Sequence, residues 1–131
     1  MKSLIVEDDF TSRLLLQEIL KSYGAVHVAV NGLEAVQAVR AAMEVGEPYT
    51  LVCMDIMMPE MDGQEALRQI RSAEESRGII SSRGAKVFMV TALDSVKNVV
   101  QSFQGLCDAY LFKPIDRFKL IDQLRAFELI A

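Results

Sequence analysis

The sequence predicts an α/β fold in which a doubly wound parallel sheet of five strands is covered by five helices. Short apolar or β-branched runs alternate along the chain with segments of helical periodicity, and this alternation indicates repeated strand–helix units. Three of the apolar runs end in charged residues, which include Glu7, Asp55 and Lys113. Ligands bind beyond the carboxyl ends of the strands in open parallel sheets, so these ends are expected to form one crevice.

Five segments are predicted as strands because they are short, apolar or β-branched and are bounded by polar, glycine or proline residues. They are residues 3–6, 25–30, 50–54, 86–90 and 109–112. The segments between them are expected to be helices, since a parallel strand needs a long crossover connection to the next one.

The first three helices are predicted from apolar spacing and from capping residues. Leu15, Ile19 and Leu20 in the first helix, and Leu33, Val36 and Val39 in the second, recur at helical spacing and are expected to face the sheet. Helices two and three should begin at Asn31 and Asp62, because each precedes a glutamate by three residues and so resembles a capping box.

The remaining helices are expected on either side of the last strand. Asp94 offers a cap for the fourth helix, and the fifth should reach nearly to Ala131. Their apolar stripes are Val96, Val99, Val100 and Phe103 in the fourth, and Leu120, Ile121 and Leu124 in the fifth. Residues 71–84 are polar and rich in glycine, which predicts a helix end followed by a mobile surface loop.

Length and composition suit one domain over residues 1–131, with no output domain in this chain. The net charge of −4 comes from 14 basic and 18 acidic residues without a basic cluster, which disfavours direct nucleic-acid binding. The sequence shows no signal peptide or apolar stretch of membrane length, so a cytoplasmic location is expected. Cys53 and Cys107 lack a metal or redox spacing and are expected to be buried and reduced, and His27 to be a strand residue without chemistry.

The acidic strand ends indicate a magnesium-dependent phosphoryl site. Glu7, Asp8 and Asp55 would repel one another near neutral pH unless a hard divalent cation lay between them. Magnesium suits such a site, because it accepts one or two carboxylates, several waters and phosphate oxygens. The neighbouring methionines favour packing over metal binding, since thioethers prefer soft ions.

Four motifs, in this order, resemble the response-regulator receiver domain of two-component signalling. They are Val6-Glu7-Asp8-Asp9, then residues 55–63 from Asp55 through Met58-Pro59 to Asp62-Gly63, then Val90-Thr91-Ala92, and last Tyr110-Leu111-Phe112-Lys113-Pro114. The resemblance spans the whole chain, and it implies a flavodoxin-like receiver fold with strand order 2-1-3-4-5.

The resemblance implies a role for each matching residue. Asp55 corresponds to the phospho-accepting aspartate, Asp8 to the direct metal ligand and Glu7 to its acidic neighbour. The backbone carbonyl of Met57 would complete the metal ligands, with Mg²⁺ as the ion and Mn²⁺ as a possible substitute. Lys113 corresponds to the lysine that neutralises charge on the phosphoryl oxygens.

Two further residues match the positions that transmit the signal in this family. Thr91 corresponds to the switch hydroxyl, and Tyr110 to the aromatic residue whose rotamer follows it. Pro114 matches a cis proline of the family.

The sequence is thus interpreted as a receiver that takes a phosphoryl group from a histidine kinase or a histidine phosphotransfer protein. The resemblance implies a switch that promotes its own phosphorylation and dephosphorylation, and not a conventional enzyme. Its downstream protein target is expected on the face of helix 4, strand 5 and helix 5, with the chain a monomer or a weak phosphorylation-dependent dimer.

Three alternatives fit the sequence less well. A receiver-like interaction module that works without phosphorylation is disfavoured by the complete acidic set. A phosphatase of the haloacid dehalogenase type needs a second aspartate two residues after the nucleophile, where Met57 stands. A flavodoxin-like flavin carrier needs a phosphate-binding loop after the first strand, where Glu7, Asp8 and Asp9 would repel a phosphate.

Overall fold

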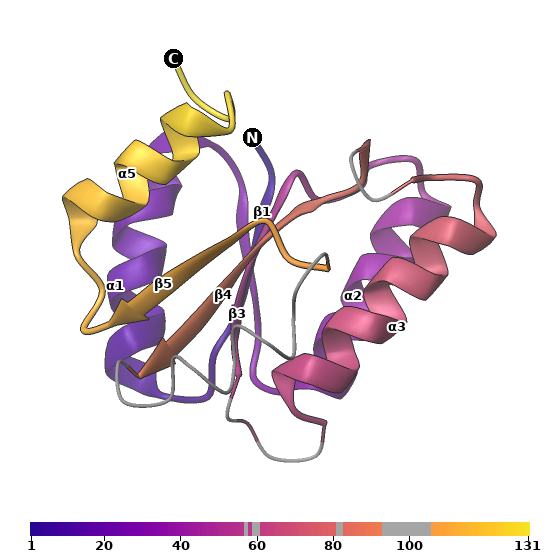
Figure 1. The fold of residues 1–131 in the computed structure, drawn as a ribbon, viewed down its shortest axis with the longest axis horizontal. Helices are drawn as coiled ribbons and strands as arrows, with labels where there is room; N and C mark the ends of the chain where they lie inside the picture. Colours follow the sequence, from indigo (N-terminus) through magenta and orange to yellow (C-terminus); the bar gives the residue numbers. More distant parts are fainter. Residues whose placement is uncertain (57, 59–60, 81–82, 93–105) are drawn as a thin grey trace.

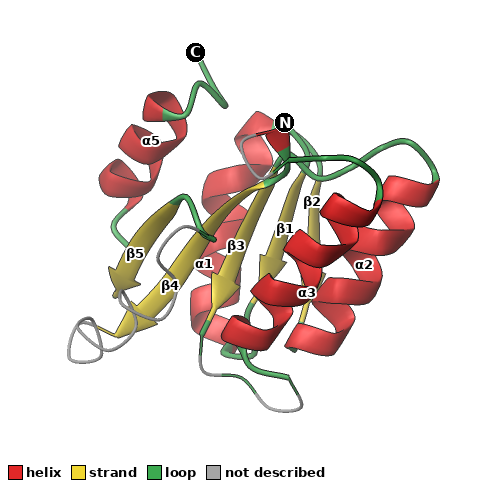
Figure 2. Cartoon of the chain, turned by 45° about the vertical axis from the view of Figure 1, so that its right-hand side comes forward, coloured by secondary structure: helices red, strands yellow, loops and turns green. Residues whose placement is uncertain are grey.

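The computed structural model describes residues 1–56, 58, 61–80, 83–92 and 106–131. A five-stranded parallel sheet in the order β2-β1-β3-β4-β5 forms its centre (Figure 2). The strands are β1 (Ser3–Val6), β2 (Val26–Ala29), β3 (Leu51–Asp55), β4 (Lys86–Ala92) and β5 (Ala109–Lys113). The sheet and its strand order confirm the predicted fold class.

Helices cover both faces of the sheet. In Figure 1, α1 (Phe10–Leu20) and α5 (Arg117–Ala126) lie on one face, and α2 (Gly32–Glu44) and α3 (Gly63–Ser76) lie on the other. A short 3₁₀ helix, Lys21–Tyr23, follows α1. These four α-helices are those of the described residues, and the predicted fourth helix of the sequence falls in 93–105, outside them.

Two hydrophobic cores lie on the two faces because neighbouring strand residues point to opposite sides of a sheet. Leu4 and Val6 of β1 pack with α2 and α3, and Ile5 between them packs with α1 and α5. Leu51 to Met54 of β3 are fully buried, as expected for a strand covered on both faces.

The predicted starts of the second and third helices are confirmed by capping hydrogen bonds. The Asn31 side chain accepts from the Glu34 amide at 2.8 Å, and the Asp62 side chain accepts from the Glu65 amide at 3.0 Å. Asp9 caps α1 in the same way, through the Ser12 amide at 2.9 Å. The caps therefore set where each helix leaves the edge of the sheet at which the acidic residues gather.

Some predictions about helix faces and ends are wrong. Leu15 and Leu33 are exposed, because the buried stripes of α1 and α2 are formed by other apolar residues at helical spacing, including Leu16 and Ala35. The last helix ends at Ala126, where Glu128 takes a positive φ and the Leu129 amide bonds back to Leu124.

In the segment 71–84 the predicted helix end is confirmed, but the expected surface position of its charged residues is wrong for two of them. Helix α3 continues to Ser76, and two of its charged residues, Arg71 and Glu74, are buried. Charge alone suggested a surface position, but ion pairing allows these side chains to enter the interior.

The two cysteines and the membrane criterion can be compared with the structure. Cys53 is fully buried, whereas Cys107 is only partly buried, which corrects the expectation for that residue. Burial raises the pKa of the Cys53 thiol to about 12. Among the described residues, the helices are too short or too polar to cross a lipid bilayer.

We predict that Gly63→Ala destabilises the protein, although alanine favours helices by about 1 kcal/mol over glycine. A Cβ at Gly63 would lie 2.6 Å from the Asp55 carbonyl oxygen and 2.9 Å from the Ile56 Cα, so backbone must move. Chemical denaturation should show a lower free energy of unfolding. Ser72→Ala, at an exposed position of the same helix, is the control and should leave stability nearly unchanged; equal stability of the two variants would contradict the prediction.

Candidate functional site: an acidic cluster facing a lysine

Three strands bring the charged site residues to one edge of the sheet. Glu7 follows β1 directly, while Asp55 and Lys113 are the last residues of β3 and β5. Val6 is in register with Met54, so Glu7 and Asp55 occupy equivalent positions on neighbouring strands. Because the sheet is parallel, all three side chains gather at its carboxyl edge, as the sequence predicted.

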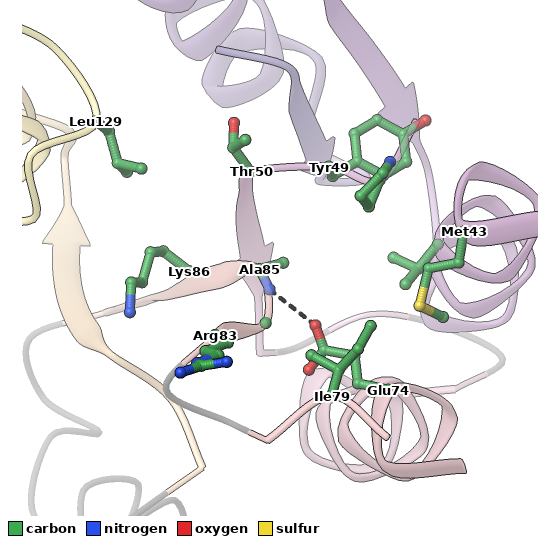
Figure 3. A pocket seen from close by; sticks show the side chains of 12 residues that line it. Met43, Tyr49, Thr50, Glu74, Ile79, Arg83, Ala85, Lys86 and Leu129 are labelled. Atoms are coloured by element: carbon green, nitrogen blue, oxygen red, sulfur yellow. Dashed lines mark hydrogen bonds between the residues drawn. The ribbon is translucent and has the colours of Figure 1, made fainter. Parts of the chain in front are cut away.

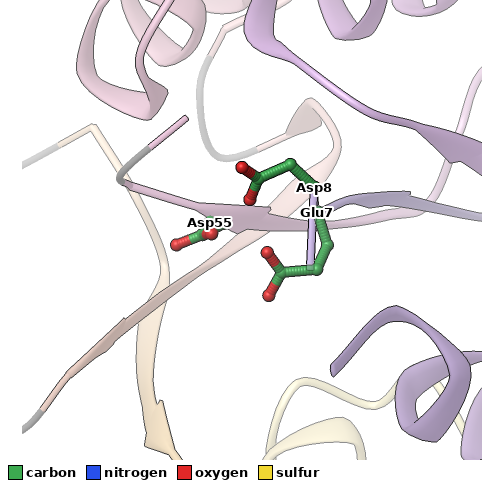
Figure 4. A group of neighbouring side chains, drawn as sticks. All are labelled: Glu7, Asp8 and Asp55. Carbon is green, nitrogen blue, oxygen red and sulfur yellow. The ribbon is translucent and has the colours of Figure 1, made fainter. Parts of the chain in front are cut away.

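The carboxylates of Glu7, Asp8 and Asp55 form a compact cluster (Figure 4). One oxygen from each lies within 4.8 Å of the others. Glu7 and Asp55 are buried, with exposed fractions of 1% and 5%, whereas Asp8 is exposed. The cluster is therefore closed on the protein side and open toward solvent at Asp8.

Lys113 reaches the two buried acids from β5. Its Nζ lies 2.8 Å from Glu7 Oε1 and 3.3 Å from Asp55 Oδ2. The side chain is partly exposed, so its ammonium group borders both the carboxylates and the solvent. An ammonium group in this place can pair with a carboxylate or with another anion at the mouth of the site.

The protonation of the cluster reflects burial first and the neighbouring negative charge second. Burial, followed by the hydrogen bond with Asp55, raises the pKa of Glu7 from 4.5 to about 7, although Lys113 acts in the opposite direction. Burial would lower the pKa of Lys113, but the hydrogen bond to Glu7 and the charge of Asp55 outweigh it and raise that pKa. The site thus keeps its lysine charged and holds Glu7 near its midpoint of ionisation at neutral pH.

Two further hydrogen bonds, which the sequence did not predict, hold Glu7 in place. Arg13 donates from Nη1 to the Glu7 carbonyl at 3.2 Å, and the Asp9 amide donates to Glu7 Oε2 at 3.4 Å. The hydrogen bond from the Ser12 amide lowers the pKa of Asp9, which acts as the cap of α1 and holds the loop after β1. The only sequence signal for Arg13 was its place one turn after Asp9.

The residues predicted to transmit a signal lie on β4, the strand beside Asp55, and on β5, the next strand of the sheet. Thr91 is buried one position beyond Val90, which is in register with Asp55, and its hydroxyl donates to the Ala92 carbonyl at 3.4 Å. Tyr110 is partly buried on β5 and packs against the core under α2 and α3. Burial, together with a hydrogen bond to Cys107, raises the pKa of Tyr110.

Two further site predictions concern the loops. The Lys113–Pro114 peptide bond is cis, as the sequence resemblance implied. Met57, predicted to offer its backbone carbonyl to a metal, lies outside the described residues.

Comparison with known proteins assigns the family. The family model of the response regulator receiver domain matches residues 3–125. The chain is 36% identical over 129 residues to the transcriptional regulatory protein ZraR of Klebsiella oxytoca, covering 98% of this chain but only 26% of ZraR. The chain thus spans about a quarter of that relative's length. This chain belongs to the response regulator receiver domain family, whose members are signalling modules and not conventional enzymes.

Solved structures agree with this assignment. The receiver domain of the histidine kinase CKI1 from Arabidopsis thaliana, complexed with Mg²⁺ and BeF₃⁻, is 31% identical with a TM-score of 0.82, covering 98% of this chain and 90% of that one. A receiver domain from Saccharomyces cerevisiae, that of Ssk1 in co-crystals with the histidine phosphotransfer protein Ypd1, is 27% identical with a TM-score of 0.78, covering 97% and 88%.

We predict that Glu7→Gln removes a pH dependence of stability in magnesium-free buffer. A carboxyl group whose pKa rises on folding stabilises the protein below its unfolded value of 4.5, and this contribution is lost as the pH rises through about 7. At pH 8 the variant should therefore be more stable than the wild type by roughly 3 kcal/mol. Urea denaturation between pH 4 and pH 8 in EDTA measures this.

The control for this pH series is Glu75→Gln, because Glu75 is exposed on α3. It should keep the wild-type dependence on pH. Parallel stability curves for Glu7→Gln and the wild type across the whole range would contradict the raised pKa of Glu7.

Proposed function

We propose that this chain is a phosphorylation-dependent switch that accepts a phosphoryl group on Asp55. The observation that carries the proposal is the cluster of three carboxylates within 4.8 Å of one another, with the Lys113 ammonium facing its two buried members. A structural cluster would be expected to neutralise its charges internally. Here burial and the neighbouring Asp55 raise the pKa of Glu7 to about 7 although Lys113 lowers it, and a further cation beside the cluster would favour the ionised form of Glu7.

The residues fit a magnesium ion as that cation. Glu7, Asp8 and Asp55 supply hard oxygen ligands, and the exposed side of Asp8 leaves room for the waters that Mg²⁺ retains. We propose that Asp8 and Asp55 bind the ion directly and that Glu7 acts beside them, with the Met57 carbonyl as a further ligand and Mn²⁺ as a substitute ion. When bound, the ion neutralises charge on phosphoryl oxygens. The Mg²⁺ and BeF₃⁻ in the CKI1 receiver structure support this choice.

The chemical step is transfer of a phosphoryl group from a histidine. A carboxylate oxygen of Asp55 attacks phosphorus, an O–P bond forms, and the P–N bond to the donor imidazole breaks. The electron pair of that bond stays on the imidazole nitrogen, which takes up a proton. Lys113 lies in position to stabilise the charge on the transferred group, since its Nζ is 3.3 Å from Asp55 Oδ2. The donor is a histidine kinase or a histidine phosphotransfer protein, as the Ssk1 complex with Ypd1 supports.

The output is proposed to pass through Thr91 and Tyr110. The Thr91 hydroxyl bonds the Ala92 carbonyl weakly, at 3.4 Å, so a phosphoryl oxygen could compete for it. Met89 is in register with Tyr110, and Thr91 lies two residues after Met89 on the same face of β4. Movement of Thr91 would therefore change the packing of Tyr110 on the adjacent strand. The downstream protein is proposed to bind the face that contains β5 and α5, together with the predicted fourth helix. The phosphorylated chain is proposed to remain a monomer or to form a weak dimer.

We predict that the wild-type chain gains one phosphoryl group from a small acyl phosphate in magnesium, and that Asp55→Asn does not. The amide of asparagine is a poor nucleophile, whereas the rest of the site is preserved. Intact-mass spectrometry with magnesium, and again with EDTA, measures the gain. Asp122→Asn, at an exposed position on α5, is the matched control and should behave like the wild type. No gain in any condition, also with a phosphohistidine donor, would refute the proposed acceptor.

We predict that Lys113→Ala preserves the fold, slows phosphoryl uptake by about tenfold and uncouples phosphorylation from the surface response. The substitution removes the ammonium group that balances charge around Asp55, so this group can no longer stabilise the phosphoryl group in the phosphorylated state. Mass spectrometry gives the rate, and the tyrosine signals in the NMR spectrum report the response. The control is Lys119→Ala, which removes an exposed ammonium group from α5. A full spectral response on phosphorylation of Lys113→Ala would contradict this role.

A further inference from the structure

A buried arginine lies at the end of the sheet opposite the acidic site. Arg71 of α3 is buried, and its guanidinium makes hydrogen bonds with four different residues. Its Nε donates to the Leu106 carbonyl at 2.9 Å, its Nη1 donates to Glu74 Oε1 and to the Ala85 carbonyl, both at 2.8 Å, and its Nη2 donates to Asp108 Oδ2 at 3.0 Å. One side chain therefore joins α3, the approach to β4 and the approach to β5.

The two acids of this group are bonded further to the backbone of β4 and its approach. Glu74 Oε2 accepts from the Ala85 amide at 2.7 Å, the bond drawn in Figure 3. Asp108 Oδ2 accepts from the Val87 amide at 2.8 Å, and the Lys86 ammonium lies 3.9 Å from Asp108 Oδ1. The planar guanidinium thus uses four of its five N–H groups in these bonds, and it holds its partners at fixed positions and angles.

Asp108 lies where the ladder between β5 and β4 begins. The Asp108 amide donates to the Val87 carbonyl at 2.9 Å, and its carboxylate accepts from the Val87 amide. The ladder then continues with Phe88 in register with Ala109 and ends with Ala92 in register with Lys113. Asp108 is thus bonded twice to one residue of β4, and Arg71 holds the carboxylate that makes the second bond.

The sequence of β5 does little to specify this alignment by itself. β5 is an edge strand whose hydrogen-bonded neighbour is β4. Its residues 109–112 are all apolar, so a shift by one residue, which turns every side chain to the opposite face, would still place apolar groups on both sides. The same shift would bring Phe112 or Pro114 to the place of Lys113. A separate device is needed to set the register.

We propose that Arg71 is a positioning residue, which through Asp108 locks the register of β5 and so holds Lys113 against Glu7 and Asp55. The effect on phosphoryl transfer rests on the proposed function. The register lock formed by Arg71 and Asp108 is a property of the fold and does not depend on it. Arg71 bonds at the beginning of β5 and Lys113 acts at its end, and the intervening strand transmits the position between them.

Native-state hydrogen exchange tests the lock without any phosphoryl chemistry. Arg71→Met should raise exchange of the β5 amides by about tenfold more than exchange of the β1 amides, because β5 opens locally. Val36→Ala, which creates a small cavity in α2, is the control for general destabilisation and should raise both sets together. Equal changes in β5 and β1 with Arg71→Met would overturn the proposal.

Arg71→Lys keeps the charge but loses the fork and covers the case in which Arg71→Met does not fold. It too should raise β5 exchange over β1 exchange, by a smaller factor than Arg71→Met. Equal changes in the two strands would again overturn the lock.

Phosphoryl uptake tests the link to Lys113. In the wild-type background, Arg71→Met (or Arg71→Lys, if Arg71→Met does not fold) should slow uptake from a small acyl phosphate by about tenfold. In the Lys113→Ala background the same substitution should slow uptake by less than about twofold, because both changes act through the Lys113 ammonium group. Equal slowing in both backgrounds would show a purely structural role. If the wild type takes up no phosphoryl group, the proposed function fails, while the exchange experiment still decides the lock.

Discussion

The ammonium group of Lys113, held between Glu7 and Asp55, is the interaction on which the rest of the site depends. Its Nζ lies 2.8 Å from one carboxylate and 3.3 Å from the other, and the three residues come from three different strands. The arrangement depends on parallel strands that end at one edge of the sheet: Glu7 follows β1 and Asp55 ends β3, two strands buried on both faces, while Lys113 ends the edge strand β5. The order β2-β1-β3-β4-β5 places β3 near the centre, so Asp55 has strands on both sides.

Lys113 balances the negative charge of the acidic cluster only in part, and the remaining charge lowers the stability of the folded state. A pKa of about 7 for Glu7 means that folding resists its ionisation in the absence of another cation. Functional sites commonly retain such destabilising charge, and here the two hydrophobic cores on either side of the sheet can offset it. Under the proposed function, binding of a divalent ion to the ionised cluster would stabilise the folded state and would couple ion binding to folding at this edge.

Much of the fold and the membership of the site could be predicted from local sequence. Short apolar or β-branched runs predicted all five strands to within two residues at each end, and Asn31 and Asp62 predicted helix starts that the structure confirms by hydrogen bonds. The buried faces of α1 and α2 were predicted less well. Leu15 and Leu33 have apolar neighbours, such as Leu16 and Ala35, that also recur at helical spacing, so spacing alone does not show which of them is buried. The burial of Arg71 was missed because its partner Asp108 is 37 residues away along the chain, and such a pair leaves no local pattern.

Two clusters of acidic side chains lie at opposite ends of the sheet, and they differ in how fully hydrogen-bond donors and positive charge satisfy their carboxylates. At one end, Glu74 and Asp108 accept hydrogen bonds from Arg71 and from the amides of Ala85 and Val87. Such acids are supplied with donors from rigid backbone and a fixed guanidinium, so a ligand could add little. At the other end, Asp8 faces solvent and Glu7 resists ionisation despite Lys113. The open side at Asp8 and the resistance of Glu7 to ionisation, and not the number of acids, therefore support the proposal that an ion and a phosphoryl group bind at the carboxyl edge.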